Sequence, residues 1–368
     1  MKNTNHFKSL VILSVVMLAM SPVKTQACTG IVLKASDGSK IVARTIEWAA
    51  TPMKTGYAVV PRGHKHQSLT PSGVDGIIYK ARYGYTGVWT EYETFIVDGI
   101  NESGLSVGLF FFPGYGKYQP YVPANKAKTL CDFHFVSWVL SSFNNIDAVK
   151  TAITQIDLVG LDPAIGTVHW RISEPNGRTV VLEFVDGKPC FYDNPLGVLT
   201  NAPGFEWHMT NLNNYVNLRT GSAAPYQITD NVSLKPFGGG SALLGIPGDY
   251  TPPSRFVRAA FMQASSPILP SGHDAALQAF RILNNFDIPI GMAYESGKAP
   301  VDLPGATQFI TVTDQHSGKL YYRTMWNSDI RCIDTKAIDY AKVKYQTHLL
   351  DDDKVQPVKM VSIPLNGK

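Results

Sequence analysis

The chain has 368 residues, of which 44% are hydrophobic and 17% are charged, and its formal net charge is +4. This composition is typical of a globular protein with a sizeable core, and it excludes a largely disordered chain. The first 27 residues contain three lysines and no acidic residue, so the remainder is nearly neutral. A nearly neutral chain lacks the basic excess that favours nucleic-acid binding.

The N-terminal segment has the pattern of a secretory signal peptide. Two lysines form a basic start, and an apolar run follows over residues 10–20. The small residues Thr25 and Ala27 then occupy the two positions that a signal peptidase reads. The apolar run is too short to span a bilayer. We therefore predict a periplasmic or secreted protein, with a signal peptide at 1–27 and a single domain over 28–368.

Strand patterns begin directly after this segment. Short runs rich in β-branched and aromatic residues, separated by turn residues, predict β-hairpins. In chain order, the predicted strand pairs are Thr29–Ala35 with Lys40–Trp48, Phe95–Asp98 with Leu105–Phe112, Val168–Ile172 with Thr179–Phe184, and Phe309–Thr313 with Lys319–Arg323. A further short strand is predicted at Tyr57–Pro61. Cys28 therefore lies at the tip of the first predicted strand.

Amphipathic patterns between these strands predict helices. The predicted helices are Cys131–Phe143, Ile146–Ile156, Glu206–Leu218, Ser254–Ala264 and His273–Asn285. The stretch 237–254 is rich in glycine and proline, and we expect it to form a long ordered loop. Repeated hairpins favour antiparallel sheets, and a wall of helices on the outer face of each sheet gives an α+β fold.

Cys28 has three interpretations. It could be the lipid anchor of a non-catalytic exported lipoprotein or binding module, but Thr25 and Gln26 stand where lipid attachment requires leucine and an adjoining apolar run. It could be a structural cysteine in a strand. It could also be an amino-terminal nucleophile. Its thiol (ordinary pKa about 8.5) would then adjoin an α-amine (about 7.7–8.0) that can act as the base.

The second predicted strand supplies neighbours for Cys28. Folding back from the first turn places this strand alongside residues 28–32, and it carries Arg44 and Glu47. Arg44 would stabilise a thiolate and lower the pKa of the thiol. Glu47 would bind and orient the α-ammonium group. Either residue alone would be interpreted as a charge on an exposed edge strand, but the pairing with Cys28 favours a catalytic role.

Five segments occur in order along the chain. They are CTG at 28–30, RTIEW at 44–48, DGINESGL at 98–105 followed by FPGY at 112–115, LTNAPGF at 199–205, and GIPGD at 245–249 followed by PSRFVR at 253–258. In this combination the chain resembles the choloylglycine hydrolase family, which comprises bile salt hydrolases and penicillin V acylases. The resemblance implies the four-layer αββα sandwich of the amino-terminal nucleophile hydrolases, and it suggests a homotetramer.

The resemblance also implies roles for individual residues. Cys28 is expected to be the nucleophile, with its own amine as the base and Arg44 as support for the thiolate. Asn201 is expected to offer its side-chain amide to the oxyanion of the tetrahedral intermediate. Arg255 is expected to complete the polar cluster. Without the family, Asn201 would be interpreted as a turn or cap residue, and Arg255 as a surface charge at a helix start.

The chain departs from the family pattern at two positions. Glu47 stands where bile salt hydrolases usually carry aspartate, so the carboxylate is kept with one more methylene group. Phe111 aligns with the second oxyanion position, which is asparagine in those enzymes and tyrosine in some penicillin V acylases. Phenylalanine has no side-chain donor. We therefore expect that only the backbone N–H of Phe111 can serve there.

The expected reaction is the hydrolysis of a linear amide bond through a thioester acyl-enzyme, without a cofactor or a metal. An apolar acyl group is expected, since aromatic residues are available to line a pocket, although half or more of them should belong to the core. These residues are Trp48, Trp89, Phe110, Phe112 and Tyr115. Candidate substrates are penicillin V, N-acyl homoserine lactones and conjugated bile salts. The export signal, Glu47 and Phe111 favour the first two.

The cysteines fit no zinc or redox motif. If Cys28 is kept free for catalysis, at most one disulfide can form among Cys131, Cys190 and Cys332 in an exported protein.

Overall fold

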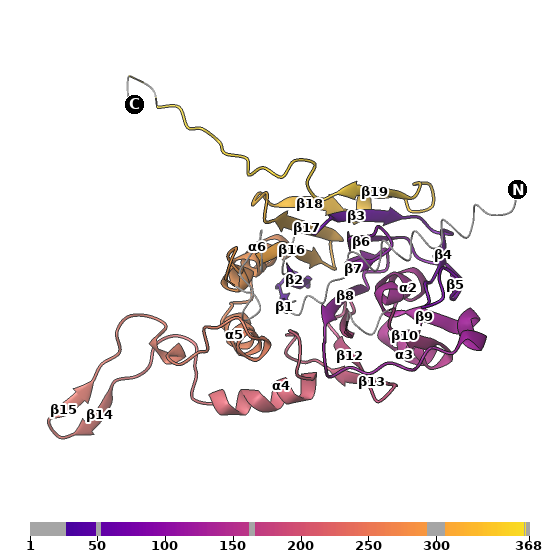
Figure 1. Ribbon diagram of the computed structural model, residues 1–368. Helices are drawn as coiled ribbons and strands as arrows, with labels where there is room; N and C mark the ends of the chain where they lie inside the picture. Colours follow the sequence, from indigo (N-terminus) through magenta and orange to yellow (C-terminus); the bar gives the residue numbers. More distant parts are fainter. Residues whose placement is uncertain (1–26, 49–52, 162–165, 293–305, 364, 366–368) are drawn as a thin grey trace, which may run out of the picture.

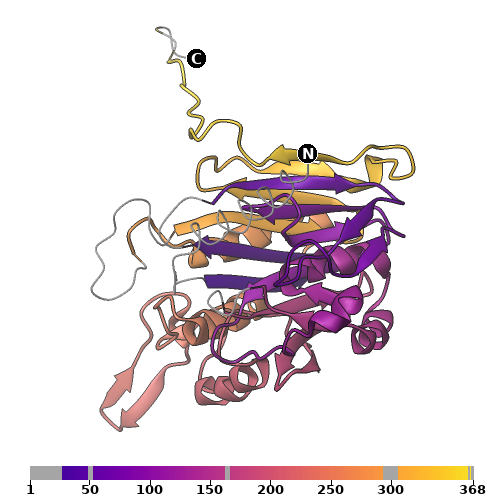
Figure 2. The same ribbon diagram turned by 45° about the vertical axis from the view of Figure 1, so that its right-hand side comes forward.

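The computed structural model describes residues 27–48, 53–161, 166–292, 306–363 and 365 (Figure 1). The predicted signal peptide lies outside the described residues, except for Ala27. Two large antiparallel sheets form the middle of the molecule, and Figure 2 shows their strands running side by side across the view.

The smaller sheet has five strands in the order β1-β2-β16-β17-β18. Their bounds are β1 Ala27–Lys34, β2 Lys40–Trp48, β16 Ala306–Asp314, β17 Lys319–Thr324 and β18 Arg331–Asp334. The first and last predicted hairpins therefore lie in one sheet, joined by the pairing of β2 with β16. The turn between β1 and β2 is tight because Gly38 adopts a φ of +92° and the Asp37 carboxylate accepts a hydrogen bond from the Ser39 N–H.

The larger sheet has eight strands in the order β13-β12-β11-β8-β7-β6-β3-β19. Their bounds are β13 Lys188–Asp193, β12 Thr179–Val185, β11 Val168–Ser173, β8 Ser106–Phe111, β7 Ile96–Asn101, β6 Tyr85–Thr90, β3 Thr55–Val60 and β19 Gln346–Leu349. The second and third predicted hairpins, β7–β8 and β11–β12, adjoin here through the pairing of β8 with β11. Strands β6, β13 and β19 were not predicted.

Helices cover the outer face of each sheet. On the smaller sheet, α5 (Pro252–Ala264) contacts β1, and α6 (Gly272–Leu283) contacts β2 and β16. On the larger sheet, α2 (Phe135–Ser142) contacts β7 and β8, and α3 (Ile146–Ala152) adds Ile146 and Val149 to the same core. The layers therefore follow the order helix, sheet, sheet, helix. This confirms the predicted αββα sandwich.

Local sequence explains where these helices begin. Two prolines occupy the first turn of α5, where their missing N–H groups cost nothing. The side chains of Ser271 and Asn145 cap α6 and α3 by accepting hydrogen bonds from the N–H groups of Asp274 and Ala148. The helix predicted from Glu206 is shorter than expected, because α4 (Phe205–Asn211) continues only as a 3₁₀ turn.

Three small two-stranded sheets complete the described fold. They pair β4 (Lys65–Gln67) with β5 (Ile78–Lys80), β9 (Thr129–Cys131) with β10 (Asp157–Val159), and β14 (Tyr226–Thr229) with β15 (Val232–Leu234). The β14–β15 hairpin extends away from the body of the molecule (Figure 1). The segment 237–251 is a loop with one 3₁₀ turn, as predicted, and α5 begins at its end. Within the described ranges, no helix combines the length and apolar character needed to cross a bilayer.

Candidate active site

The register of the first hairpin brings Arg44 to Cys28. Cys28 lies opposite Ile46 and Gly30 lies opposite Arg44, so the two side chains are diagonal neighbours on one face of the sheet. Arg44 Nη2 lies 2.9 Å from Cys28 Sγ. Both side chains are buried, with exposed fractions of 1% for Arg44 and 6% for Cys28. The structure thus confirms the expected juxtaposition of thiol and guanidinium.

Main-chain groups and one aromatic ring hold the Arg44 guanidinium in place. Nη1 donates hydrogen bonds to the carbonyl oxygens of Val97, at 3.1 Å, and Leu109. Nε donates to the Thr45 carbonyl at 3.3 Å. The Phe110 ring lies against the guanidinium, with 4.2 Å between the Arg44 Cζ and the ring centroid. These contacts leave Nη2 directed at the thiol.

Strands β7 and β8 of the larger sheet separate near Cys28, which leaves their carbonyl groups free to bond to Arg44. Strand β7 pairs with β8 only as far as Asp98 and Gly108. Beyond this point β8 turns the carbonyl groups of Leu109 and Phe111 toward the site instead of toward a strand. The Phe111 N–H also faces this side and lowers the pKa of the Cys28 thiol. The backbone N–H expected at position 111 is therefore directed toward Cys28.

Asn201 and Arg255 hold the main chain of Cys28. Asn201 Oδ1 accepts hydrogen bonds from the Cys28 N–H at 2.9 Å and from Arg255 Nη2 at 2.6 Å. Arg255 Nη1 donates to the Cys28 carbonyl and, at 2.8 Å, to the Thr29 hydroxyl. Asn201 Nδ2 donates to the Phe111 carbonyl at 2.7 Å. An amide nitrogen carries two hydrogens, so one remains for a further acceptor.

Glu47 lies beside the residue that precedes Cys28, and one of its carboxylate oxygens has no partner among the described residues. It pairs with Ala27 in the β1–β2 ladder and is only 3% exposed. Its Oε1 accepts a hydrogen bond from the Thr307 hydroxyl at 3.2 Å, whereas Oε2 has no partner among the described residues. Burial raises the pKa of this carboxyl to about 7, although Arg255 opposes the shift. A buried oxygen without a partner is a docking point for a donor.

The balance of effects on the Cys28 thiol differs from the one expected. Arg44 lowers the pKa of the thiol, as predicted, and the Phe111 N–H and Arg255 act in the same direction. Burial, however, is the largest effect, and it raises the pKa above the ordinary value, with a further contribution from Glu47. Arg44 therefore does not bring the pKa of the thiol below its ordinary value.

A second buried charge cluster beneath the site was not predicted. Gly30 has no side chain, and a Cβ there would lie 2.8 Å from the Phe110 ring and 2.9 Å from Arg171 Nη1. Arg171 is 1% exposed and donates a hydrogen bond to the Ala43 carbonyl at 3.0 Å. Asp98 is also buried, and its charge favours the protonated form of Arg171. The signal in the sequence was an arginine in the middle of a predicted strand that also carries Val168, Trp170 and Ile172.

The predicted pocket aromatics are mostly core residues. Trp89 (1% exposed), Phe110 (0%) and Phe112 (1%) are fully buried, so their rings offer no surface to an acyl group in this structure. Tyr115, by contrast, is 56% exposed. The side chain of Trp48 lies outside the described part of the chain. This agrees with the expectation that half or more of these aromatics belong to the core, and it removes the three buried rings from the predicted pocket lining.

The remaining cysteines are not paired. Cys131, Cys190 and Cys332 all carry free thiols, as does Cys28. In the part of the chain that the structure describes, no three His, Cys, Asp or Glu side chains gather in a way that could hold a metal ion.

Comparison with known proteins places the chain in a family. The sequence model of the linear amide C–N hydrolases, choloylglycine hydrolase family, matches residues 28–341. The chain belongs to this family. It is therefore an enzyme of the choloylglycine hydrolase type, and the matched region begins at Cys28 itself.

Individual relatives agree with this assignment to the choloylglycine hydrolases. The bile salt hydrolase/transferase of Clostridium perfringens is 32% identical over 83% of this chain and 92% of its own length. The penicillin V acylase of Pectobacterium atrosepticum is 25% identical over 92% of this chain and 89% of its own length. A solved structure of a mutant conjugated bile acid hydrolase from Clostridium perfringens superimposes with a TM-score of 0.76 at 28% identity, covering 91% of this chain and all of that chain.

A second solved structure shares the fold at lower identity. The penicillin V acylase from Agrobacterium tumefaciens has a TM-score of 0.70 and 20% identity, and the match covers 88% of this chain and 91% of that chain.

Proposed function

We propose that cleavage after Ala27 exposes Cys28 as the amino-terminal nucleophile of an exported linear amide hydrolase. The observation that carries the proposal is that the sulfur and the nitrogen of Cys28 are held by different side chains. Arg44 Nη2 lies 2.9 Å from the Cys28 sulfur, and Asn201 Oδ1 lies 2.9 Å from the Cys28 nitrogen. A thiol and an amine held in this way can act together only once the bond to Ala27 is cut.

Acylation follows from these positions. The freed α-amine of Cys28 takes the thiol proton, and the thiolate forms a C–S bond to the carbonyl carbon of the substrate. The carbonyl electron pair moves onto oxygen, where the Phe111 N–H and the second N–H of Asn201 Nδ2 can stabilise it. The C–N bond then breaks, and the α-ammonium gives its proton to the leaving amine. The acyl group remains on sulfur as a thioester.

Deacylation repeats the proton transfers with water. The α-amine takes a proton from water as the oxygen attacks the thioester, and the same donors stabilise the second oxyanion. Collapse breaks the C–S bond, the α-ammonium returns its proton to the Cys28 sulfur, and the carboxylic acid leaves. The unpartnered Oε2 of Glu47 offers the α-ammonium an acceptor during both steps. The raised pKa of the thiol makes this base necessary, because little thiolate forms without it.

We propose a substrate with an apolar acyl group and a small amine. Penicillin V, N-acyl homoserine lactones and the conjugated bile salts glycocholate and taurocholate meet this description. Glu47 and Phe111 depart from the bile salt hydrolase pattern and favour the first two. The higher identity to the bile salt hydrolase relative favours the third. A panel of these compounds, compared by kcat/KM, decides between them.

The processing step is tested by intact mass. The purified exported protein should have the mass of residues 28–368 without an adduct. A diacylglycerol adduct on Cys28 would instead support a lipid-anchored binding protein, and an uncut chain with full activity would contradict the requirement for a free amine.

The nucleophile is tested by Cys28→Ala. This variant should keep its circular dichroism spectrum and lose hydrolysis of every compound in the panel, because no other group occupies the thiol position. Cys190→Ala is the matched control, since Cys190 is a free and only partly buried cysteine. It should retain wild-type rates. Undiminished hydrolysis by Cys28→Ala would end the proposed mechanism.

A further inference from the structure

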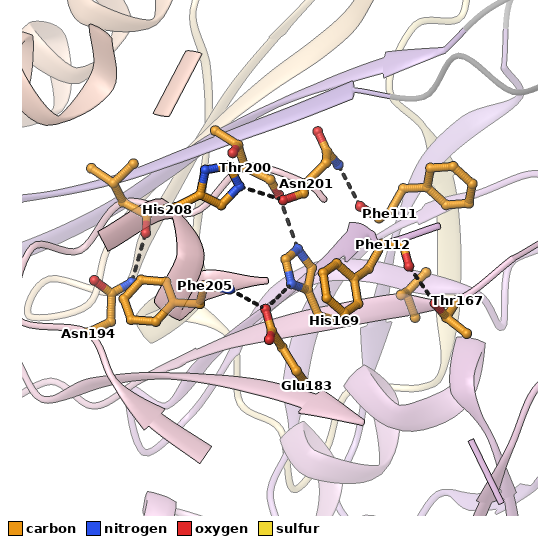
Figure 3. A network of polar contacts seen from close by, with 12 residues as sticks. Phe111, Phe112, Thr167, His169, Glu183, Asn194, Thr200, Asn201, Phe205 and His208 are labelled. Carbon is orange, nitrogen blue, oxygen red and sulfur yellow. Dashed lines mark hydrogen bonds and ion pairs between the residues drawn. The ribbon is translucent and has the colours of Figure 1, made fainter. Parts of the chain in front are cut away.

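A chain of buried polar contacts lies behind Asn201 (Figure 3). Two histidines act on consecutive carbonyl groups: His169 Nε2 lies 3.1 Å from the Thr200 oxygen, and His208 Nε2 lies 2.9 Å from the Asn201 oxygen. Both rings are fully buried. These contacts fix the backbone that carries Asn201, but neither histidine touches Cys28 in the structure. The two histidines therefore orient the Asn201 side chain through its backbone.

The two histidines differ in what faces their second nitrogen. His169 Nδ1 lies 3.0 Å from Glu183 Oε1, so both of its ring nitrogens face oxygen acceptors. A neutral imidazole has only one N–H. Its other nitrogen would then face an oxygen with no hydrogen between them, which is repulsive. Both contacts are hydrogen bonds only if His169 is an imidazolium. Phe112 supports this state, because its ring stacks on the His169 ring at 4.4 Å with an interplanar angle of 6°.

His208 has the opposite pattern. Its Nε2 faces the Asn201 oxygen, whereas its Nδ1 has no partner among the described residues. A single N–H, on Nε2, satisfies this arrangement, so His208 fits the neutral form of the imidazole. Burial lowers the pKa of His208 to about 4, and the charges of His169 and Arg255 lower it further. One imidazolium and one neutral ring therefore hold the Thr200 and Asn201 carbonyl groups, and Glu183 contacts the imidazolium.

Glu183 joins the two histidine contacts into one unit. Its Oε1 accepts hydrogen bonds from His169 and from the Phe205 N–H, at 2.9 Å, in the first turn of α4. The same helix carries His208. Glu183 is 2% exposed, so its charge has no solvent to balance it. Removal of this carboxylate would leave a buried cation unpaired and free the start of α4.

From these contacts we propose that His169 and Glu183 form a buried imidazolium–carboxylate pair that positions Asn201 for oxyanion stabilisation. The inference rests on the proposed function, because it assigns Asn201 the oxyanion-donor role. His169 and Glu183 are positioning residues, since they act through the Thr200–Asn201 backbone. Asn201 stabilises charge that exists only in the transition state. A change in the orientation of its side chain therefore lowers kcat and kcat/KM together.

Kinetics of Glu183 variants test the proposal, with the best compound of the substrate panel as probe. Glu183→Ala should lower kcat about 10–100-fold with KM changed less than about threefold, because small misplacements of a catalytic donor cost rates of this size. Glu183→Gln keeps an oxygen acceptor of the same shape, so it should restore kcat to within about threefold at neutral pH.

Glu174→Ala is the matched control for Glu183→Ala. Glu174 is also a buried carboxylate, in the turn between β11 and β12, and its Oε1 accepts a hydrogen bond from the Ile146 N–H at the start of α3. Its loss should lower the melting temperature and leave kcat unchanged, because it lies away from Asn201. Equal kcat losses in the two alanine variants, or a kcat for Glu183→Gln as low as that of Glu183→Ala, would overturn the proposal.

Nuclear magnetic resonance supplies a readout that needs no turnover. In ¹⁵N-labelled protein at pH 7, both ring nitrogens of His169 should be protonated, whereas His208 should carry one proton. His169→Gln assigns the signals, and the spectrum is recorded on Cys28→Ala protein as well. A neutral His169 overturns the inference even where the enzyme is active. A cationic His169 in a protein that hydrolyses no amide would leave the pair in place and remove the proposed function instead.

Discussion

Cys28 is held on two flanks that are built in different ways. On the Arg44 flank, the guanidinium is fixed by main-chain carbonyl groups of neighbouring strands and by the Phe110 ring. On the Asn201 flank, the amide and its backbone are fixed by the side chains of Arg255 and His208. The first flank depends on strand geometry and the second on side-chain charge. They should therefore respond differently to substitution and to pH.

The largest effect should follow from a change on the strand-built flank. In Arg44→Lys a single ammonium group replaces a planar fork, and it cannot reach the thiol and the carbonyl groups of Val97 and Leu109 together. We expect kcat/KM to fall about 10³-fold, comparable to the loss of a preorganised donor in a buried site. Steady-state kinetics on the panel measure it. Arg62→Lys, at an exposed ion pair with Glu102, is the control.

A rate for Arg44→Lys within tenfold of wild type would break the comparison. It would mean that a positive charge is sufficient on this flank and that strand geometry is not required.

The next largest effect is expected for the amide on the other flank. Asn201→Ala removes the proposed oxyanion donor and the acceptor for the Cys28 nitrogen, so kcat should fall about 10²–10³-fold. The matched control is Asn194→Ala, because Asn194 is also buried and donates a hydrogen bond to the Val198 carbonyl in the same loop. This control should lose stability but not kcat. A rise in KM with unchanged kcat for Asn201→Ala would show a binding role instead.

The pH response should sharpen the comparison through His208. Its pKa is about 4 in the folded chain, against an ordinary value of 6.5, so the unfolded chain binds the extra proton first. Stability is therefore lost as pH falls from about 6.5 to about 4, by an amount on the order of 3 kcal/mol. His208→Gln keeps a donor for the Asn201 carbonyl and cannot be protonated.

Urea unfolding of both proteins across this pH range provides the measurement. The difference in unfolding free energy should shift in favour of His208→Gln as the solution is acidified. Parallel curves for the two proteins would show that His208 does not sense pH on this flank.

The smallest effect is expected beneath the strand-built flank. Gly30→Ala forces a Cβ against the Phe110 ring and Arg171, so the free energy of unfolding should fall by about 1–3 kcal/mol. Gly239→Ala is the control, because nothing lies within 4 Å of a Cβ there. Denaturant melts compare the two variants. Equal stability would mean that the ring and the arginine can move aside.

The sequence predicted the Arg44 flank more fully than the Asn201 flank. A tight turn and two adjacent strands determine a register, so the meeting of Cys28 and Arg44 could be inferred from local pattern alone. Asn201 and Arg255 lie more than 170 positions further along the chain from Cys28, and only the resemblance brought them to the site. Distance in sequence leaves no local signal for such a contact.

The supporting charges were missed for a different reason. Arg171, His169 and Glu183 lie on strands that are buried on both faces, where alternation no longer separates core from surface. Their burial could not be deduced from the pattern of their neighbours. The pKa of the Cys28 thiol was misjudged for the same reason, because burial outweighs the attraction of Arg44 only in the assembled layers.

The opening of the larger sheet beyond Gly108 turns one backbone amide into a reporter group. The Phe111 N–H lies beyond the end of the β7–β8 pairing and faces Cys28, where it lowers the pKa of the thiol. Its proton resonance and its rate of exchange with solvent deuterium should therefore change whenever the sulfur is ionised, acylated or alkylated. Each change in the state of the Cys28 sulfur can thus be followed at one peptide group. The measurement needs neither a chromogenic substrate nor knowledge of the natural substrate.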